Sequence, residues 1–257
     1  MIEVKEIYKK FEDNSGEPTN ALLGVNMNIK KGSIYGLVGA NGSGKTTLLK
    51  HLVGLYLPDS GSISIDDELF INNPQLKERI SFISDDLFFF RGYSCKKLKT
   101  FYKSMYKKFN EERYEKLVEL LGVNPKRSVG RFSKGMQKQV AFIFAMCTMP
   151  DILVLDEPID GLDPLVRINI FNEIIDDVAE RGTTVIVSSH NLKEMDGICD
   201  WVGIIKGGRM LKEAELDSLK QEYTTTETPS LDEIFVKIYS QDDQKIDKKI
   251  ETIEVVS

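Results

Sequence analysis

The stretch that decides the fold of this chain reads Gly39-Ala40-Asn41-Gly42-Ser43-Gly44-Lys45-Thr46. It follows an apolar run that ends at Val38 and opens a helical pattern that continues to Leu55. A G-x-x-x-x-G-K-[ST] pattern between a strand and a helix is the context of a phosphate-binding loop. The glycines let the backbone wrap around phosphates, and successive N–H groups at the helix start attract anions. We therefore predict a bound nucleotide at this loop.

Individual roles in the loop follow from side-chain chemistry. Lys45 would contact the β- and γ-phosphates, and the Thr46 hydroxyl would ligate Mg²⁺. The alternative, a glycine-rich turn that binds nothing, is disfavoured because the pattern stands between a strand and a helix. The residues predicted to bind the nucleotide are Gly39, Ala40, Asn41, Gly42, Ser43, Gly44, Lys45, Thr46 and Thr47.

The composition is that of a globular chain with an acidic balance. The 257 residues are 41% hydrophobic and 29% charged, with a net charge of -6. No strong basic field is available, so we expect no nucleic-acid partner. The cysteines Cys95, Cys147 and Cys199 show no C-x-x-C pairing, and we expect them to be reduced, buried thiols of a cytosolic protein. No run of about 18 apolar residues occurs, so any membrane role must come through a partner.

Hydrophobic periodicity changes twice along the chain. Before about residue 86 and after about residue 149, strand-like apolar runs alternate with helical patterns, as in an α/β domain. Between them, apolar residues from Leu98 to Phe109 repeat at helical spacing, and Asn110 is placed to cap a second helix. We therefore predict a helical insertion at about 86–149 within a domain spanning 1–240. Residues 241–257 show little apolar periodicity and mixed charge, which predicts a frayed or extended, flexible tail.

Two acids follow the continuous apolar run that ends at Leu155, a pattern typical of a buried central strand of a parallel sheet. Asp156 suits the acid that holds Mg²⁺, and Glu157 is the candidate general base for an attacking water. An isolated Asp-Glu pair more often caps the next helix. We expect the phosphate loop to lie on a neighbouring strand, which would make the two acids converge on the γ-phosphate.

These motifs, with a further segment, resemble the ATP-binding subunit of an ABC transporter over roughly residues 2–240. The signature of that family, L-S-G-G-Q, appears here as Phe132-Ser133-Lys134-Gly135-Met136-Gln137. Ser133, Gly135 and Gln137 match, and the other three positions depart from it. The Ser-x-Gly-Met variant resembles the exporter branch often called ABC-2 type. Ser133 would also cap the following helix, whose N-terminus attracts an anion.

Two more family elements match the region after Glu157. The D-loop resembles Asp160-Gly161-Leu162-Asp163, and the switch histidine resembles His190, which follows a strand. The resemblance implies that His190 hydrogen-bonds the γ-phosphate and helps to position water. The second histidine, His51, lies in the helix after the phosphate loop, and we expect a structural role for it.

Two positions are less well matched to the family. The aromatic residue that stacks on adenine corresponds to Phe11, with Tyr8 as the alternative and an ordinary core aromatic as a third interpretation. Where the family has Gln or Glu, after a strand that ends at Ile83, the best match is Asp85, which would contact Mg²⁺ through water. The aromatic run at 87–90 is either core or part of a groove for a membrane-domain helix.

The resemblance implies an α/β fold, with a P-loop ATPase core, an N-terminal antiparallel β subdomain and the helical insertion. It also implies an ATPase that dimerises around ATP and Mg²⁺ with a second, identical or similar subunit. Such a pair would drive separate integral membrane subunits from the inner face of the cell membrane and power export. The alternatives are an ABC ATPase without a membrane partner and a weakly hydrolysing regulatory half of a heterodimer.

Overall fold

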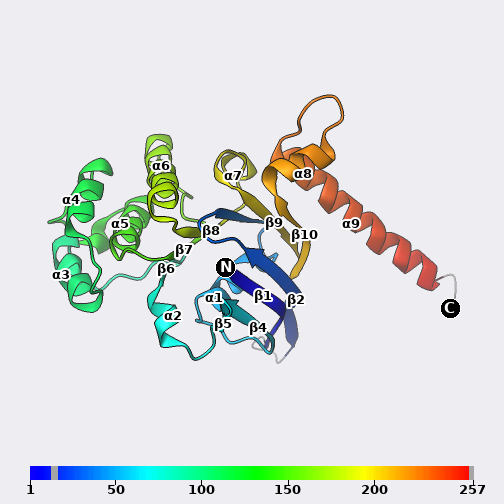
Figure 1. Cartoon of the computed structure of the whole chain (residues 1–257), viewed down its shortest axis with the longest axis horizontal. Coiled ribbons are helices and arrows are strands. Elements are labelled where there is room, and N and C mark those ends of the chain that lie inside the picture. Colours follow the sequence, from blue (N-terminus) through cyan, green and yellow to red (C-terminus); the bar gives the residue numbers. More distant parts are fainter. Residues whose placement is uncertain (13–16, 255–257) are drawn as a thin grey trace.

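Two β-sheets form the body of the molecule in the computed structural model, which describes residues 1–12 and 17–254 (Figure 1). A six-stranded sheet has the order β10-β9-β3-β8-β7-β6, and a four-stranded sheet has the order β2-β1-β4-β5. The strands are β1 (Ile2–Glu12), β2 (Pro18–Ile29), β3 (Ile34–Val38), β4 (Ser60–Ile65), β5 (Glu68–Leu69), β6 (Ile80–Ile83), β7 (Ile152–Asp156), β8 (Thr184–Ser189), β9 (Trp201–Lys206) and β10 (Arg209–Glu215).

The two sheets differ in strand direction. In the larger sheet the described pairs are parallel, except that β10 runs antiparallel to β9 after the turn at Gly207-Gly208. The smaller sheet is antiparallel throughout its described pairs. The predicted α/β core with an N-terminal antiparallel β subdomain is therefore confirmed.

Helices cover the larger sheet and extend the molecule at one end. They are α1 (Lys45–Leu52), α2 (Pro74–Glu78), α3 (Cys95–Met105), α4 (Glu111–Leu120), α5 (Lys134–Cys147), α6 (Pro164–Arg181), α7 (Leu192–Ile198), α8 (Leu216–Tyr223) and α9 (Leu231–Glu254). A short 3₁₀ turn, Val129–Arg131, precedes α5. Helices α3, α4 and α5 lie together at the end opposite to α9 (Figure 1).

The parallel strands are buried on both faces, which explains their continuous apolar runs. Along β7, Ile152 and Val154 belong to one hydrophobic cluster with α1 and the antiparallel sheet. Leu153 and Leu155 belong to a second cluster, which includes α5 and the helical insertion. Alternate side chains of one strand thus join two cores. The three cysteines are free and buried, as predicted.

One expectation about strand order is wrong. The strand before the phosphate loop, β3, does not neighbour β7, because β8 lies between them. The end of β8 fills this gap with Ser188, whose hydroxyl donates to Asp156 Oδ1 over 2.7 Å. The loop and the acids still converge, because the carboxyl ends of all three parallel strands meet at one edge of the sheet.

The predicted helix boundaries are confirmed where a cap defines them. The Asn110 side chain accepts a hydrogen bond from Arg113 N over 2.9 Å at the start of α4. Ser133 caps α5 in the same way, through Met136 N over 3.2 Å. Gly182 ends α6 in the left-handed conformation, with φ of +67°.

The prediction of a frayed or extended tail from residue 241 is wrong for 241–254, and residues 255–257 lie outside the described part. Helix α9 continues to Glu254 and extends away from the body (Figure 1). Its first turns are docked through the buried Leu231, Ile234 and Ile238. Ser230 and Glu233 bond each other's backbone N–H groups in a capping box. Docked and capped turns nucleate a helix that weak periodicity alone does not predict.

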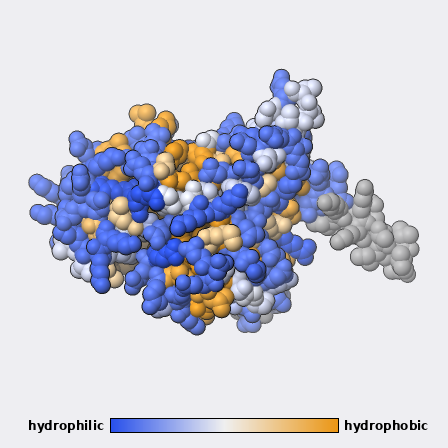
Figure 2. Space-filling model, in the orientation of Figure 1, coloured by the Kyte–Doolittle hydropathy of each residue, from blue (hydrophilic) through white to orange (hydrophobic). Residues whose placement is uncertain are grey.

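The face shown in Figure 2 is mostly hydrophilic, with apolar side chains gathered over α6 and at the lower edge, near α1 and β5. On that helix Leu165 is 76% exposed and Ile168 is 55% exposed.

Candidate functional site

The phosphate loop folds as its glycines require. Gly42 and Gly44 have φ of +75° and +110°, conformations that other residues rarely adopt. At Gly39 a Cβ atom would lie 2.4 Å from the Ile205 carbonyl oxygen, so only glycine fits between the loop and β9. The loop lines a cavity of about 460 Å³. Residues 41–47 line it together with Asp85, Glu157, Asp160 and His190.

Lys45 is a buried cation that faces this cavity. Its ammonium donates to the Gly39 carbonyl over 2.8 Å and to the Ala40 carbonyl over 3.3 Å. The same nitrogen lies 3.5 Å from Glu157 Oε1. Its side chain is only 6% exposed, so its charge is weakly screened and would attract an anionic phosphate strongly.

Asp156 is fully buried at the end of β7. Its Oδ1 accepts from the Thr46 hydroxyl over 3.2 Å and from the Ser188 hydroxyl. Its Oδ2 has no hydrogen-bond partner among the described residues. A buried carboxylate oxygen without a partner is costly, and beside a threonine hydroxyl it suits a hard cation such as Mg²⁺. The predicted pair of ligands, Thr46 and Asp156, therefore fits this ion.

Glu157 directs its carboxylate at the cavity from a strained backbone position, with φ of +46°. His190 Nδ1 lies 3.1 Å from Glu157 Oε2, and His190 N donates to the same oxygen over 3.4 Å. Burial raises the pKa of the Glu157 carboxyl, although the charges of Lys45 and His190 partly oppose that effect. A carboxylate with a raised pKa accepts a proton more readily, as a general base must.

Comparison with known proteins agrees with this geometry. Residues 22–160 match the family model described as ABC transporter, which is more than half of the chain. The chain belongs to the ABC transporter family. It is an ATP-binding subunit of that family and an ATPase.

Three curated relatives share between 30% and 35% identity with this ABC ATPase. ABC transporter ATP-binding protein YtrB of Bacillus subtilis is 30% identical over 223 residues, which are 87% of this chain and 75% of YtrB. Bacitracin transport ATP-binding protein BcrA of Bacillus licheniformis is 35% identical, over 77% of this chain and 65% of BcrA. Lantibiotic transport ATP-binding protein SrtF of Streptococcus pyogenes is 33% identical, over 84% of this chain and 92% of SrtF.

Solved structures share the fold. The structure described as the ATP binding subunit of an ABC transporter superposes with a TM-score of 0.82 and 26% identity, over 93% of this chain and 99% of that one. The ATP-binding cassette MJ0796, solved as a dimer in a post-hydrolysis state with ADP and Pi, has a TM-score of 0.75 and 22% identity. It covers 84% of this chain and 99% of its own.

The D-loop of the ABC ATPase adds a carboxylate that the sequence did not assign to the catalytic group. Asp160 Oδ2 lies 3.8 Å from His190 Nδ1. Side-chain atoms of Glu157, Asp160 and His190 all lie within 4.8 Å of one another. The signal was available, because Asp160 follows Glu157 by three residues in a turn.

Asp85 lines the same cavity, and its contact with Mg²⁺ through water stays a prediction. Its Oδ1 forms an ion pair with Lys138 Nζ over 2.9 Å. Lys138 is a residue that sequence reasoning missed. The signal was a lysine within α5, a helix whose other side chains are mostly apolar and buried.

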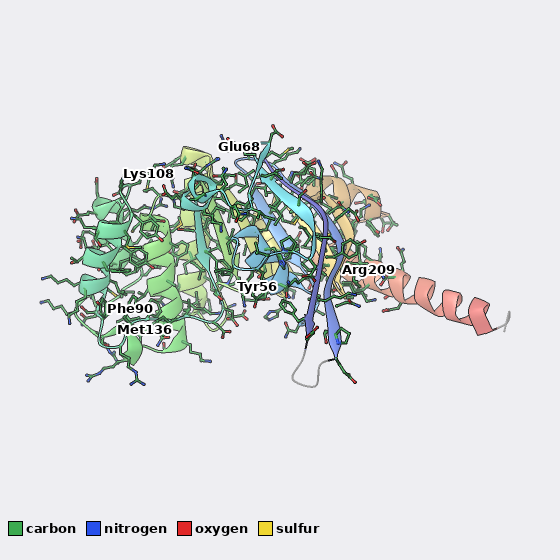
Figure 3. The ribbon with its side chains drawn as sticks, turned by 90° about the horizontal axis from the view of Figure 1, so that it is seen from below. Tyr56, Glu68, Phe90, Lys108, Met136 and Arg209 are labelled. Carbon is green, nitrogen blue, oxygen red and sulfur yellow. The ribbon has the colours of Figure 1, made fainter. Side chains whose placement is uncertain are left out.

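The signature segment lies outside this cavity. Ser133, Gly135 and Gln137 are not among the residues that line the space beside the phosphate loop. Gly135 packs closely on the D-loop, where a Cβ atom would lie 2.8 Å from the Gly161 carbonyl oxygen. In Figure 3, Met136 lies at the helical end of the molecule, away from Tyr56 beside the antiparallel sheet. The chain therefore does not bring its own signature to its own nucleotide loop.

The predicted adenine-stacking residue lies at the margin of the site. Phe11 pairs in β1 with Thr19, which lines the cavity, and its ring centroid is 5.3 Å from that of Tyr56. Tyr8 instead contacts Glu6. The role of Phe11 stays a prediction. His51 is buried against Thr47, with 2.7 Å between its Nδ1 and the Thr47 carbonyl, as expected for a structural residue.

The C-terminal helix also contacts the phosphate loop. Ala40 N donates to the Tyr239 hydroxyl over 3.2 Å, and that hydroxyl donates to the Ile205 carbonyl over 2.7 Å. Lys206 Nζ donates to the Tyr239 carbonyl over 3.2 Å. This tertiary contact ties α9 to the start of the loop, and no local pattern in the sequence predicts it.

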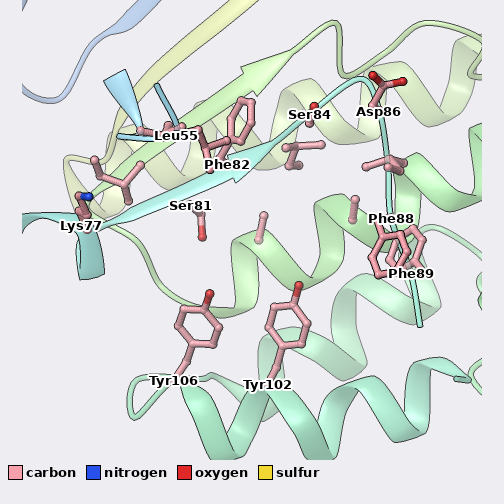
Figure 4. Close-up of a pocket in the computed structure, with 16 residues that line it drawn as sticks. Leu55, Lys77, Ser81, Phe82, Ser84, Asp86, Phe88, Phe89, Tyr102 and Tyr106 are labelled. Atoms are coloured by element: carbon pink, nitrogen blue, oxygen red, sulfur yellow. The ribbon is translucent and has the colours of Figure 1, made fainter. Parts of the chain in front are cut away.

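A second cavity, of about 370 Å³, lies between β6 and helices α3 and α5 (Figure 4). Phe88 and Phe89 stand at one end of it, and Tyr102 and Tyr106 line the α3 side. Phe89 packs against the core, whereas Phe88 is 83% exposed. The aromatic run therefore fits both interpretations in part. Phe89 belongs to the core, and the exposed ring of Phe88 is accessible to a partner protein.

The raised pKa of Glu157 predicts the acid limit of hydrolysis. If its carboxylate is the base, kcat/KM falls as pH drops through the raised pKa of the free enzyme, because the protonated acid accepts no proton. The acid limb then lies at a higher pH than for an ordinary glutamate. The negative charge of Asp160 contributes to the rise, so Asp160→Asn moves the limb to lower pH. A pH profile of kcat/KM for both proteins measures this, and an unmoved limb would contradict it.

Proposed function

We propose that this ATPase is the cytoplasmic, peripheral subunit of an exporter and that it dimerises around ATP and Mg²⁺. The observation that carries the proposal is the separation of two half-sites on one chain. The phosphate loop and its acids share one cavity, and the signature segment lies elsewhere. A second subunit, identical or similar, supplies its Ser133–Gln137 segment to the nucleotide held by the first.

Hydrolysis proceeds from the contacts of the first half-site. Lys45 leaves the loop carbonyls and binds the β- and γ-phosphates. Thr46 and Asp156 would hold Mg²⁺, which would supply positive charge to the phosphate oxygens. Glu157 takes a proton from the attacking water, and His190 hydrogen-bonds the γ-phosphate and orients that water. Asp85 lines the same cavity and would contact the metal ion through water.

Dimer closure follows from charge and helix geometry. Ser133 caps α5 through Met136 N, and the positive end of the helix dipole at this terminus attracts an anion. The γ-phosphate of the opposite subunit provides the anion. ATP favours the closed pair because it contacts both surfaces, and loss of the γ-phosphate removes one set of contacts.

The partner at the membrane is a pair of integral membrane subunits. No helix in the described residues combines the length and apolarity needed to cross a bilayer. The cavity beside Phe88 is a groove between the sheet and the helical insertion, with exposed aromatic surface at its end. Exposed aromatic surface of this kind suits an intracellular helix of a membrane subunit.

The proposed substrate leaves the cell and is an amphipathic or antimicrobial peptide or a lipid-like molecule. Two observations support this choice. The Ser-x-Gly-Met form of the signature resembles the exporter branch, and two relatives are named for bacitracin transport and lantibiotic transport.

Replacing the base tests the hydrolytic mechanism. Glu157→Gln keeps the size of the side chain but cannot accept a proton, so kcat falls by about 10²- to 10⁴-fold while ATP still binds. Steady-state ATPase assays and a binding titration with ATP measure the two effects. Equal rates for the variant and the wild type would refute the role of Glu157.

Charging the groove tests the membrane partner. Phe88→Asp places a charge on the exposed aromatic surface, so less protein cosediments with membranes of the organism that encodes the chain, stripped of peripheral proteins. Val236→Asp, at a 61% exposed position on α9, is the control and binds as the wild type does. Equal binding by both variants would remove the groove from the interface. Failure of the wild type to bind would remove the membrane partner.

A further inference from the structure

A buried lysine connects the helical insertion to Glu157, which directly follows strand β7. Lys138 lies on α5, and its side chain is only 9% exposed. Its ammonium donates to the Glu157 carbonyl oxygen over 2.7 Å and lies 2.9 Å from Asp85 Oδ1. Buried ammonium groups are costly unless they are hydrogen-bonded or paired, and this one is both. Neither the family motif nor the proposed mechanism assigns it a role.

The carbonyl that Lys138 bonds belongs to a strained residue. Glu157 has φ of +46°, in the left-handed region that non-glycine residues rarely adopt. Such strain persists only where the surroundings hold the backbone from several sides. On one side Glu157 N donates to the Ser188 hydroxyl over 3.1 Å and lies 3.3 Å from the Ser188 carbonyl. On the other side the bond comes from Lys138.

These two contacts fix the peptide groups on both sides of the Glu157 Cα atom. Ser188 holds the N–H and Lys138 holds the carbonyl, so the direction of the side chain is set by residues outside its own strand. The carboxylate then reaches Lys45 and His190 in the cavity. Release of the carbonyl would let the backbone relax toward ordinary φ values and move the carboxylate.

We propose that Lys138 is a positioning residue for the base, which it holds in its strained conformation and links to Asp85. The inference rests on the proposed function, since it takes Glu157 as the base. Lys138 touches neither the nucleotide loop nor the reacting atoms and acts through the Glu157 backbone. The Asp85 carboxylate, 59% exposed, balances the charge of the lysine at the point where the family has Gln or Glu.

The test removes the ammonium and keeps the unbranched, four-atom stem of the side chain. Lys138→Met removes both bonds, and kcat for ATP falls by about 10- to 100-fold because a displaced base loses much of its effect. KM for ATP and the affinity for ATP in a binding titration stay within about twofold, because the phosphate loop keeps its contacts. Lys138→Arg keeps a cationic donor and restores part of kcat.

A matched control separates positioning from the loss of an ion pair. Lys220 on α8 is partly buried, and its Nζ lies 2.6 Å from Asp196 Oδ1. It is not among the residues that line the cavity. Lys220→Met leaves kcat unchanged. Thermal unfolding of each variant shows whether it is folded. Loss of the ion pair with Lys138 leaves the Asp85 carboxylate hydrated, because that side chain is mostly exposed.

A second background distinguishes this inference from the proposed function. In the Glu157→Gln protein, adding Lys138→Met does not lower the residual ATPase rate further, because the effect of Lys138 passes through Glu157. If Glu157→Gln loses activity but folded Lys138→Met keeps the wild-type kcat, the positioning role is wrong and the base stands. If Glu157→Gln keeps the wild-type rate, the proposed base itself is wrong. A rise in KM with unchanged kcat in Lys138→Met would assign the lysine to nucleotide binding and overturn the inference.

Discussion

An opposite pair of charges, held nearly out of water, is the interaction on which the site depends. Lys45 and Glu157 lie 3.5 Å apart with side chains that are 6% and 13% exposed. Charges in such a setting interact strongly, and separating either from its partner is costly. An incoming phosphate can replace the carboxylate as the partner of Lys45, which leaves Glu157 available to water. The site therefore holds side by side the two groups to which the proposed mechanism assigns phosphate binding and proton transfer.

The rest of the fold brings these charges together. Lys45 begins α1 after the loop that follows β3, and Glu157 directly follows β7. Strand β8, which lies between β3 and β7, contributes Ser188 to both Asp156 and Glu157. Burial of alternate side chains of β7 in two hydrophobic clusters fixes that strand in the sheet. Strain at Glu157 is then tolerated, because hydrogen bonds from neighbouring elements outweigh its cost of about 1–3 kcal/mol.

The parts of the site with local signals were predictable from the sequence. Gly42 and Gly44 mark positive φ, Ser133 marks a helix start, and Asp156 and Glu157 follow a buried apolar run. What escaped prediction depends on contacts between distant segments. No local pattern in the sequence indicates that β8 lies between β3 and β7 in the sheet. Lys138 is an ordinary lysine until α5 packs beside Asp85, and Tyr239 acquires its contact with Ala40 only when α9 docks.

The proposed division of one site between two chains is tested most directly by the mass of the protein in solution. We expect the Glu157→Gln protein to be a monomer with ADP and a dimer with ATP and Mg²⁺, as measured by light scattering at one protein concentration. Ser133→Arg in the same background should remain monomeric with ATP, because it removes the cap and crowds the contact with the opposite nucleotide. A Glu157→Gln protein that binds ATP fully and stays monomeric up to high concentration would contradict the two-chain site.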